Sequence, residues 1–174
     1  PVRIICDSEL RIPLNSRICQ TAGEYDTIIA CGNTPQNRIS ALDALGITVL
    51  QVPDETGKVN LTELMYVLHD MKIDSILLEG GGTLNESMLQ ADLVNEIKVF
   101  IAPKVIGGAL AKSPVEGPGI DDIKDAVVFK LINVEKFDDD IVEKVFYVIN
   151  GKIIPYIEGG IFYGPNDGKD DWPS

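Results

Sequence analysis

The chain has little of what metal centres and disulfide frameworks are made from. It holds three cysteines, one histidine and no Cys-x-x-Cys pair. An odd number of cysteines without patterned spacing predicts reduced thiols rather than disulfides. His69 lies among apolar residues of an expected helix, so we interpret it as structural. We therefore expect neither a Cys/His zinc site nor a Cys–His catalytic pair, and no bound metal.

Long apolar runs and excess positive charge are also missing. No stretch approaches the roughly 20 residues that span a bilayer, and no basic segment precedes an apolar one as in a signal peptide. The expected compartment is therefore the cytoplasm. The formal net charge of −12 at pH 7 argues against nucleic acid or an anionic membrane as a partner. A phosphorylated small molecule stays compatible, because a local group of N–H donors acts at short range.

What is present is the composition of an ordinary globular domain. The chain has 174 residues, of which 45% are hydrophobic and 24% charged, enough for one domain with a sizeable core. Strand and helix patterns alternate in its first half, which favours parallel pairing. Thr34-Pro35 predicts the start of one helix, which Gly46 ends, and Asn60 with Glu63 predicts the start of another. Strands are expected at residues 2–6, 27–31, 47–52 and 73–78.

The second half of the chain has a different pattern. Residues 96–102 and two runs within 126–149 are strand-like, and Asp138-Asp139-Asp140 predicts the loop of an antiparallel hairpin. The expected fold class is therefore α/β, a mixed sheet flanked by helices with a C-terminal antiparallel hairpin, over residues 1–149. Residues 150–174 are rich in Gly, Pro and Asp and predict a loosely held extension, in which 161–163 is a candidate extra strand.

The most informative stretch is the glycine turn, residues 80–82. An apolar strand ends in Glu79, three glycines follow, and a helix pattern opens in which Thr83 and Glu86 predict a capping box. Glycines allow close approach to the backbone, and the free N–H groups of a helix start attract anions. A phosphate or pyrophosphate is the natural ligand. The alternative is a tight strand-to-helix packing turn, since the stretch is neither G-x-G-x-x-G nor a Walker motif.

Four blocks of sequence, residues 1–13, 59–61, 75–85 and 101–108, together suggest a family. In order and spacing they resemble segments of the reductase domain of riboflavin biosynthesis, and the match runs from Pro1 to about Val148. The resemblance implies a dihydrofolate-reductase-like fold and a homodimer. It also implies NADPH-dependent reduction of the ribosyl group of a 5-amino-6-(5-phosphoribosylamino)uracil-type substrate to ribityl.

Carried over by position, the resemblance assigns site residues. It implies that Glu79 contacts the substrate, a phosphorylated pyrimidine; the alternative is a carboxylate bonded to the amides of its own turn. For Ser8 there are two interpretations: the resemblance implies a contact with the cofactor, and the alternative is a structural role in the turn after a strand. Lys104 and Gly107-Gly108 either border the substrate cleft or form a connection. No side chain is a clear proton donor: Glu79 would serve only if desolvation raised its pKa, and a water molecule is the alternative. The implied cofactor-binding residues are Ser8, Gly81, Gly82, Thr83, Leu84, Asn85, Glu86 and Ser87.

The sequence also departs from that family. Its reductase domain normally opens with a Ser-Leu-Asp-Gly-type strand upstream of Pro1, so the chain resembles the larger C-terminal portion of such a domain. Two alternatives therefore stay open, a non-catalytic nucleotide-binding or assembly module and a different dihydrofolate-reductase-like enzyme acting on another heterocycle. Arg11 and Arg38 are candidates for reading the 2′-phosphate of the cofactor, because both are cationic and near expected strand ends. The competing interpretation is that both are simply solvated.

Overall fold

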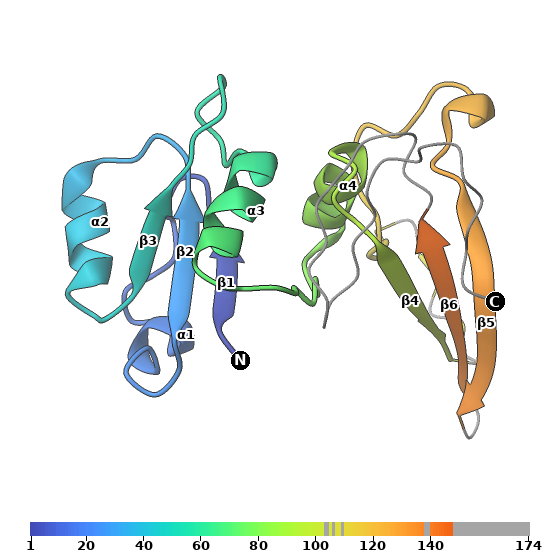
Figure 1. Ribbon diagram of the computed structural model, residues 1–174, viewed down its shortest axis with the longest axis horizontal. Coiled ribbons are helices and arrows are strands. Elements are labelled where there is room, and N and C mark those ends of the chain that lie inside the picture. Colours follow the sequence, from blue (N-terminus) through green and yellow to red (C-terminus); the bar gives the residue numbers. More distant parts are fainter. Residues whose placement is uncertain (103–104, 106, 109, 138–139, 148–174) are drawn as a thin grey trace. The chain divides into compact units, whose positions relative to one another are not determined.

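A computed structural model describes residues 1–102, 105, 107–108, 110–137 and 140–147 (Figure 1). The chain divides into two compact units, Pro1–Lys72 and Ile73–Ser174, and each is described by itself. The single domain expected over residues 1–149 therefore stays a prediction. The extension at 150–174, with its candidate strand at 161–163, lies outside the described residues.

The first unit is built on a three-stranded parallel sheet in the order β1-β2-β3. Its strands are β1 (Arg3–Cys6), β2 (Thr27–Cys31) and β3 (Thr48–Gln51), close to the three strands expected there. β2 is central and all five of its residues are buried, as expected for a strand covered on both faces. The parallel pairing predicted from the alternating pattern is confirmed.

Three helices connect and cover these strands: α1 (Arg17–Gln20), α2 (Gln36–Asp43) and α3 (Leu61–Asp70). The apolar side chains of α1, α2 and the β1–α1 connection close one core cluster around the middle of the sheet. All three cysteines are free thiols, and burial raises the pKa of the Cys6 thiol. The buried members of the cluster are Leu10, Cys19, Ala22, Ile29, Cys31, Ile39, Leu42 and Ile47.

The two predicted helix starts in this unit have different outcomes. Asn60 caps α3 as expected, with its side-chain oxygen accepting the backbone N–H of Glu63 at 3.0 Å. Thr34 does not cap α2, because Pro35 takes the N-cap position in an extended conformation. The Thr34 hydroxyl instead donates to Cys31 Sγ at 3.4 Å. The helix therefore begins one residue later than the Thr34-Pro35 pattern predicts.

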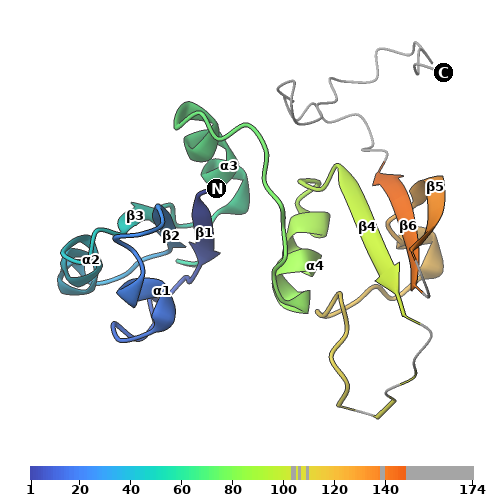
Figure 2. The ribbon, with the colours of Figure 1, turned by 90° about the horizontal axis from the view of Figure 1, so that it is seen from below.

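The second unit contains α4 (Gly82–Gln90), the short 3-10 helix η1 (Ile123–Asp125) and an antiparallel sheet in the order β4-β6-β5. Its strands are β4 (Glu96–Ile101), β5 (Phe129–Phe137) and β6 (Asp140–Tyr147). β5 and β6 pair antiparallel, while residues 138–139 between them lie outside the described part. The turn of the predicted hairpin therefore stays a prediction. Both views show α4 beside β4 (Figure 1, Figure 2).

The strand predicted at residues 73–78 is wrong. In the described part of the chain this segment pairs with no other strand, and Leu77 is 82% exposed. An apolar run alone does not make a strand, since the ladder needs a neighbour to accept and donate its hydrogen bonds. The segment instead leads directly into the glycine turn.

Among the residues that the structure describes, no helix combines the length and apolar character needed to cross a bilayer.

Candidate functional site

The glycine turn leads into α4 without any side-chain cap. Gly81 is the N-cap residue, with φ −71° and ψ 164°, and its carbonyl accepts the N–H of Asn85 at 3.0 Å. The predicted capping box of Thr83 and Glu86 is wrong, because the helix begins at Gly82 and Thr83 is already inside it. The Thr83 carbonyl accepts the hydroxyl of Ser87 at 2.9 Å.

One side of this helix start is open. The first-turn N–H groups of Gly82, Thr83 and Leu84 have no acceptor in the helix itself, and none is present among the described residues. A Cβ placed on Gly81 would meet no atom within 4 Å. The backbone on the Gly81 side is thus accessible, and its amides and helix dipole favour a negative charge. The residues present fit a phosphate group on this side.

The other side is occupied by residues 113–117, which we call the covering segment. A Cβ on Gly82 would lie 2.6 Å from Glu116 Cγ and 2.8 Å from the carbonyl oxygen of Ser113. Asn85 Nδ2 donates to the carbonyl of Pro114 at 2.8 Å. Nothing local to the sequence of residues 113–117 indicates that they pack on α4.

The polar side chains around the glycine turn are the carboxylates of Glu79 and Glu86 and the amide of Asn85. Glu79 is exposed and, within the described residues, has no hydrogen-bonding partner; the expected alternative, a carboxylate bonded to the turn amides, is not formed. Asn85 Oδ1 is buried without a partner in the described part of the chain. A buried unpaired acceptor costs free energy, so the packing of Asn85 under the covering segment is less favourable at this atom. Glu86 lies against Gly117 of the covering segment.

Ser8 belongs to the first unit and has structural partners. Its hydroxyl accepts the N–H of Val59 at 3.1 Å, and its carbonyl accepts the N–H of Gly32 at 3.0 Å. These contacts support the alternative that Ser8 is a turn residue after β1. A cofactor contact for Ser8 stays a prediction.

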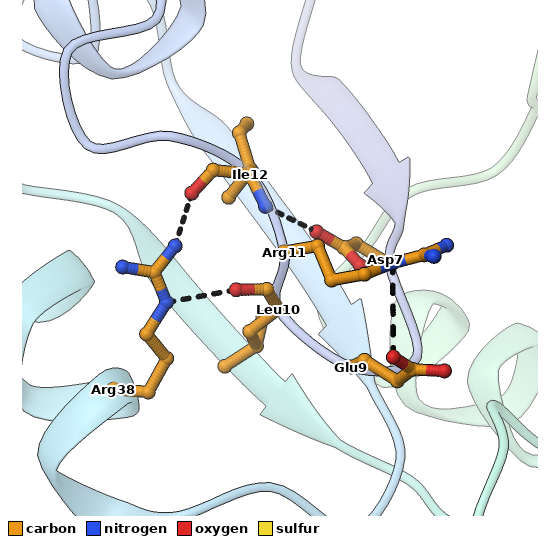
Figure 3. Close-up of polar contacts among 6 residues, drawn as sticks. All are labelled: Asp7, Glu9, Leu10, Arg11, Ile12 and Arg38. Atoms are coloured by element: carbon orange, nitrogen blue, oxygen red, sulfur yellow. Dashed lines mark hydrogen bonds and ion pairs between the residues drawn. The ribbon is translucent and has the colours of Figure 1, made fainter.

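The two candidate arginines differ in their contacts at the β1 loop, residues 7–13 (Figure 3). Arg38 of α2 donates from Nε to the carbonyl of Leu10 at 2.8 Å and from Nη2 to the carbonyl of Ile12. Arg11 forms an ion pair with Glu9 at 3.8 Å, and its side chain is 80% exposed. Arg38 therefore serves the fold, while the Arg11 guanidinium is presented to solvent.

The remaining candidates lie after β4. Gly107 and Gly108 adopt left-handed conformations, with φ 65° and φ 104°, which side chains rarely tolerate. Such conformations are compatible with a sharp connection, and a place of the two glycines at the border of a substrate cleft stays a prediction. Lys104 lies outside the described residues, so its predicted place at a substrate cleft stays a prediction. No group of three or more His, Cys, Asp and Glu side chains able to hold a metal is found among the residues described.

Residues 1–143 match the family model described as the RibD C-terminal domain. The chain belongs to this family. It is 45% identical over 141 residues to the riboflavin biosynthesis protein RibD of Actinobacillus pleuropneumoniae, covering 81% of this chain and 38% of that relative. It is 36% identical over 152 residues to the 2,5-diamino-6-ribosylamino-4(3H)-pyrimidinone 5′-phosphate reductase of Methanothermobacter thermautotrophicus, covering 87% and 67%.

A solved RibD structure has the same fold. RibD of Acinetobacter baumannii, form 2, matches with a TM-score of 0.67 at 24% identity, covering 85% of this chain and 38% of that one. The predicted family is thus confirmed, and so is a mixed helix-and-strand fold with a parallel sheet. The chain spans well under half the length of the RibD proteins that it matches.

Proposed function

We propose that the chain reduces the ribosyl side chain of a phosphoribosylaminopyrimidine to ribityl in riboflavin biosynthesis, with NADPH as reductant. The substrate is 5-amino-6-(5-phosphoribosylamino)uracil or its 2,5-diamino analogue. The observation that carries this proposal is the family match over residues 1–143, supported by a relative named as such a reductase. We further propose that the protein acts as a homodimer in the cytoplasm.

The glycine turn and α4 supply the binding chemistry. The open amides at the start of α4 hold the pyrophosphate of the dinucleotide, with contacts from residues 81–87. Hydrogen bonds to a charged group contribute roughly 1.5–3 kcal/mol each. The open space beside Gly81 supports this role, because a Cβ there would meet nothing within 4 Å. When bound, the nicotinamide supplies a hydride to the carbonyl carbon of the opened ribose.

Glu79 is the proposed substrate contact. It directly precedes the glycine turn, its carboxylate is exposed, and no described residue accepts or donates a hydrogen bond to it. A carboxylate in that state accepts bonds from ribose hydroxyls or from ring N–H groups. The proton that completes the reduction goes to the oxygen of the reduced carbonyl and comes from water, because a carboxylate that accepts bonds from the substrate has no proton to donate.

The test is turnover of the purified chain. The pyrimidine substrate should cause loss of NADPH absorbance, and mass spectrometry should show a product heavier by two hydrogens. Glu79→Gln should raise KM for the pyrimidine and leave KM for NADPH unchanged, while Glu24→Gln, at an exposed turn of the first unit, should change neither. Nucleotide binding without turnover would identify the non-catalytic module instead. Consumption of dihydrofolate would identify the other reductase class, and no dinucleotide binding at millimolar concentration would reject all three.

A further inference from the structure

The β1 loop is held in one shape by its own backbone and by Asp7 (Figure 3). The Asp7 carboxylate accepts the N–H of Ile12 at 2.8 Å, and the Asp7 carbonyl accepts the N–H of Leu10 at 3.0 Å. The side chain of Leu10 is only 1% exposed and belongs to the core. The residues on both sides of Arg11 are therefore fixed to the body of the unit.

Arg38 adds a second clamp from α2. Its guanidinium binds the carbonyls of Leu10 and Ile12, the two residues that flank Arg11. Leu10 has φ +50°, a left-handed conformation that is unfavourable for a branched side chain. Such a conformation persists only where the surroundings over-determine it, and it is typical of functional segments. The loop is thus rigid at the point where Arg11 leaves it.

The Arg11 side chain is not used by the fold. It is 80% exposed, and its ion pair joins Nε to Glu9 Oε2 at 3.8 Å, with Glu9 itself 73% exposed. A pair so exposed is screened by solvent and contributes little. The chain therefore holds a guanidinium on a rigid base with a weak, displaceable partner, the arrangement that precise recognition needs.

The position and chemistry of Arg11 indicate its ligand. The loop follows the carboxyl end of β1, and ligands of parallel sheets bind outside the carboxyl ends of the strands. A guanidinium binds phosphate with two parallel hydrogen bonds. We propose that Arg11 binds the 2′-phosphate of the cofactor and thereby selects NADPH over NADH. This inference rests on the proposed function; Arg38 has no part in it, since backbone carbonyls occupy its guanidinium.

The kinetic test compares the two cofactors. Arg11→Ala should raise KM for NADPH roughly 10- to 100-fold, the loss of charge-assisted bonds to one phosphate, and leave the NADH parameters unchanged. Glu9→Gln should lower KM for NADPH, because Arg11 loses its competing partner. The matched control is Arg17→Ala, which removes an exposed arginine of α1, near the opposite end of the sheet (Figure 1). If Arg11→Ala changes both cofactors alike, or neither, the inference is wrong.

A binding test separates the inference from the proposed reaction. Titration calorimetry with 2′,5′-ADP and with 5′-AMP needs no turnover. The wild type should prefer the 2′-phosphorylated nucleotide, and Arg11→Ala should abolish that preference without changing the midpoint of unfolding. Preference without turnover would retain the role of Arg11 and reject the reductase activity. Equal turnover of NADPH and NADH by the wild type would retain the activity and reject the role of Arg11.

Discussion

The hydroxyl of Ser8 accepts the backbone N–H of Val59 at 3.1 Å, across 51 positions of the chain. The bond fastens the end of β1 to the turn before α3. The backbones of Gly32 and Gly57 also lie very close together. A Cβ on Gly32 would stand 1.8 Å from the carbonyl oxygen of Gly57. Contacts between loops distant in sequence therefore hold the loops at the carboxyl edge of the parallel sheet together.

Removing the Ser8 hydroxyl should destabilise the first unit. Ser8→Ala leaves the part-buried N–H of Val59 unpaired, and we expect a loss of about 1–2 kcal/mol in the free energy of unfolding. Ser8→Thr keeps a hydroxyl and should retain most of the stability. Denaturant unfolding measures both variants. Unchanged stability of Ser8→Ala, together with weaker dinucleotide binding, would favour the cofactor contact over the structural role.

The two neighbouring glycines of the turn should respond differently to alanine. Gly82→Ala places a Cβ 2.8 Å from the Ser113 carbonyl, a backbone atom that moves only with the covering segment. We expect a loss of about 1–3 kcal/mol in stability, as for other overpacked sites. Gly81→Ala meets nothing within 4 Å and should cost less, under about 1 kcal/mol, the ordinary difference between glycine and alanine at a helix N-cap. Equal unfolding free energies for the two variants would contradict this packing.

Glu116 should oppose anion binding at the start of α4. Its Cβ and Cγ pack against Gly82 in the first turn of α4, whose amides attract negative charge, and its carboxylate accepts the N–H of Ser113 at 3.1 Å within the covering segment. Glu116→Gln should therefore tighten dinucleotide binding severalfold, with a smaller gain at high salt because exposed charges are screened. Titration at two ionic strengths measures this, with Glu24→Gln as the control for net charge. The explanation fails if both variants tighten binding equally.

The Asp54 carboxyl should make the stability of the first unit depend on pH. The pKa of its carboxyl is lowered, first by the Thr56 hydroxyl at 2.8 Å and then by the backbone amides of Lys58 and Thr56. Since the folded pKa lies below the unfolded one, this carboxylate stabilises the fold above about pH 4, and the effect is lost as the pH falls through the lowered value. Asp54→Asn should be less stable than wild type at pH 7 and equal to it in strong acid. Glu55→Gln, in the same turn, should show no such convergence in pH-dependent unfolding.

The parts of the fold that sequence could predict are those determined locally. The strands β1 and β2 follow from apolar runs bounded by turn residues, and the start of α3 follows from Asn60 and Glu63. The parallel pairing follows from the alternation of strands with helices. In each case neighbouring residues carry enough information to select the conformation.

Local sequence patterns do not determine the remaining features. The covering segment reaches α4 through Pro114 and Asn85, 29 positions apart, and no local pattern encodes that contact. Thr83 has good capping chemistry, yet the extended Gly81 starts the helix earlier. Residues 73–78 have strand-forming side chains but no described neighbour. The covering segment and residues 73–78 thus depend on partners that the local sequence does not contain, whereas Thr83 loses the cap position to a glycine two residues earlier.

Arg38 should be a stability residue, in contrast to Arg11. Arg38→Ala removes the donors to two carbonyls of the β1 loop, and charge-assisted bonds of this kind contribute roughly 1.5–3 kcal/mol each before relaxation. The left-handed conformation of Leu10 loses its support at the same time. We expect a loss of several kcal/mol in the free energy of unfolding, only partly restored by Arg38→Lys, because an ammonium lacks the planar fork that reaches both carbonyls. Arg11→Ala should unfold at the wild-type midpoint, so equal destabilisation by the two alanine variants would contradict the division of roles between these arginines.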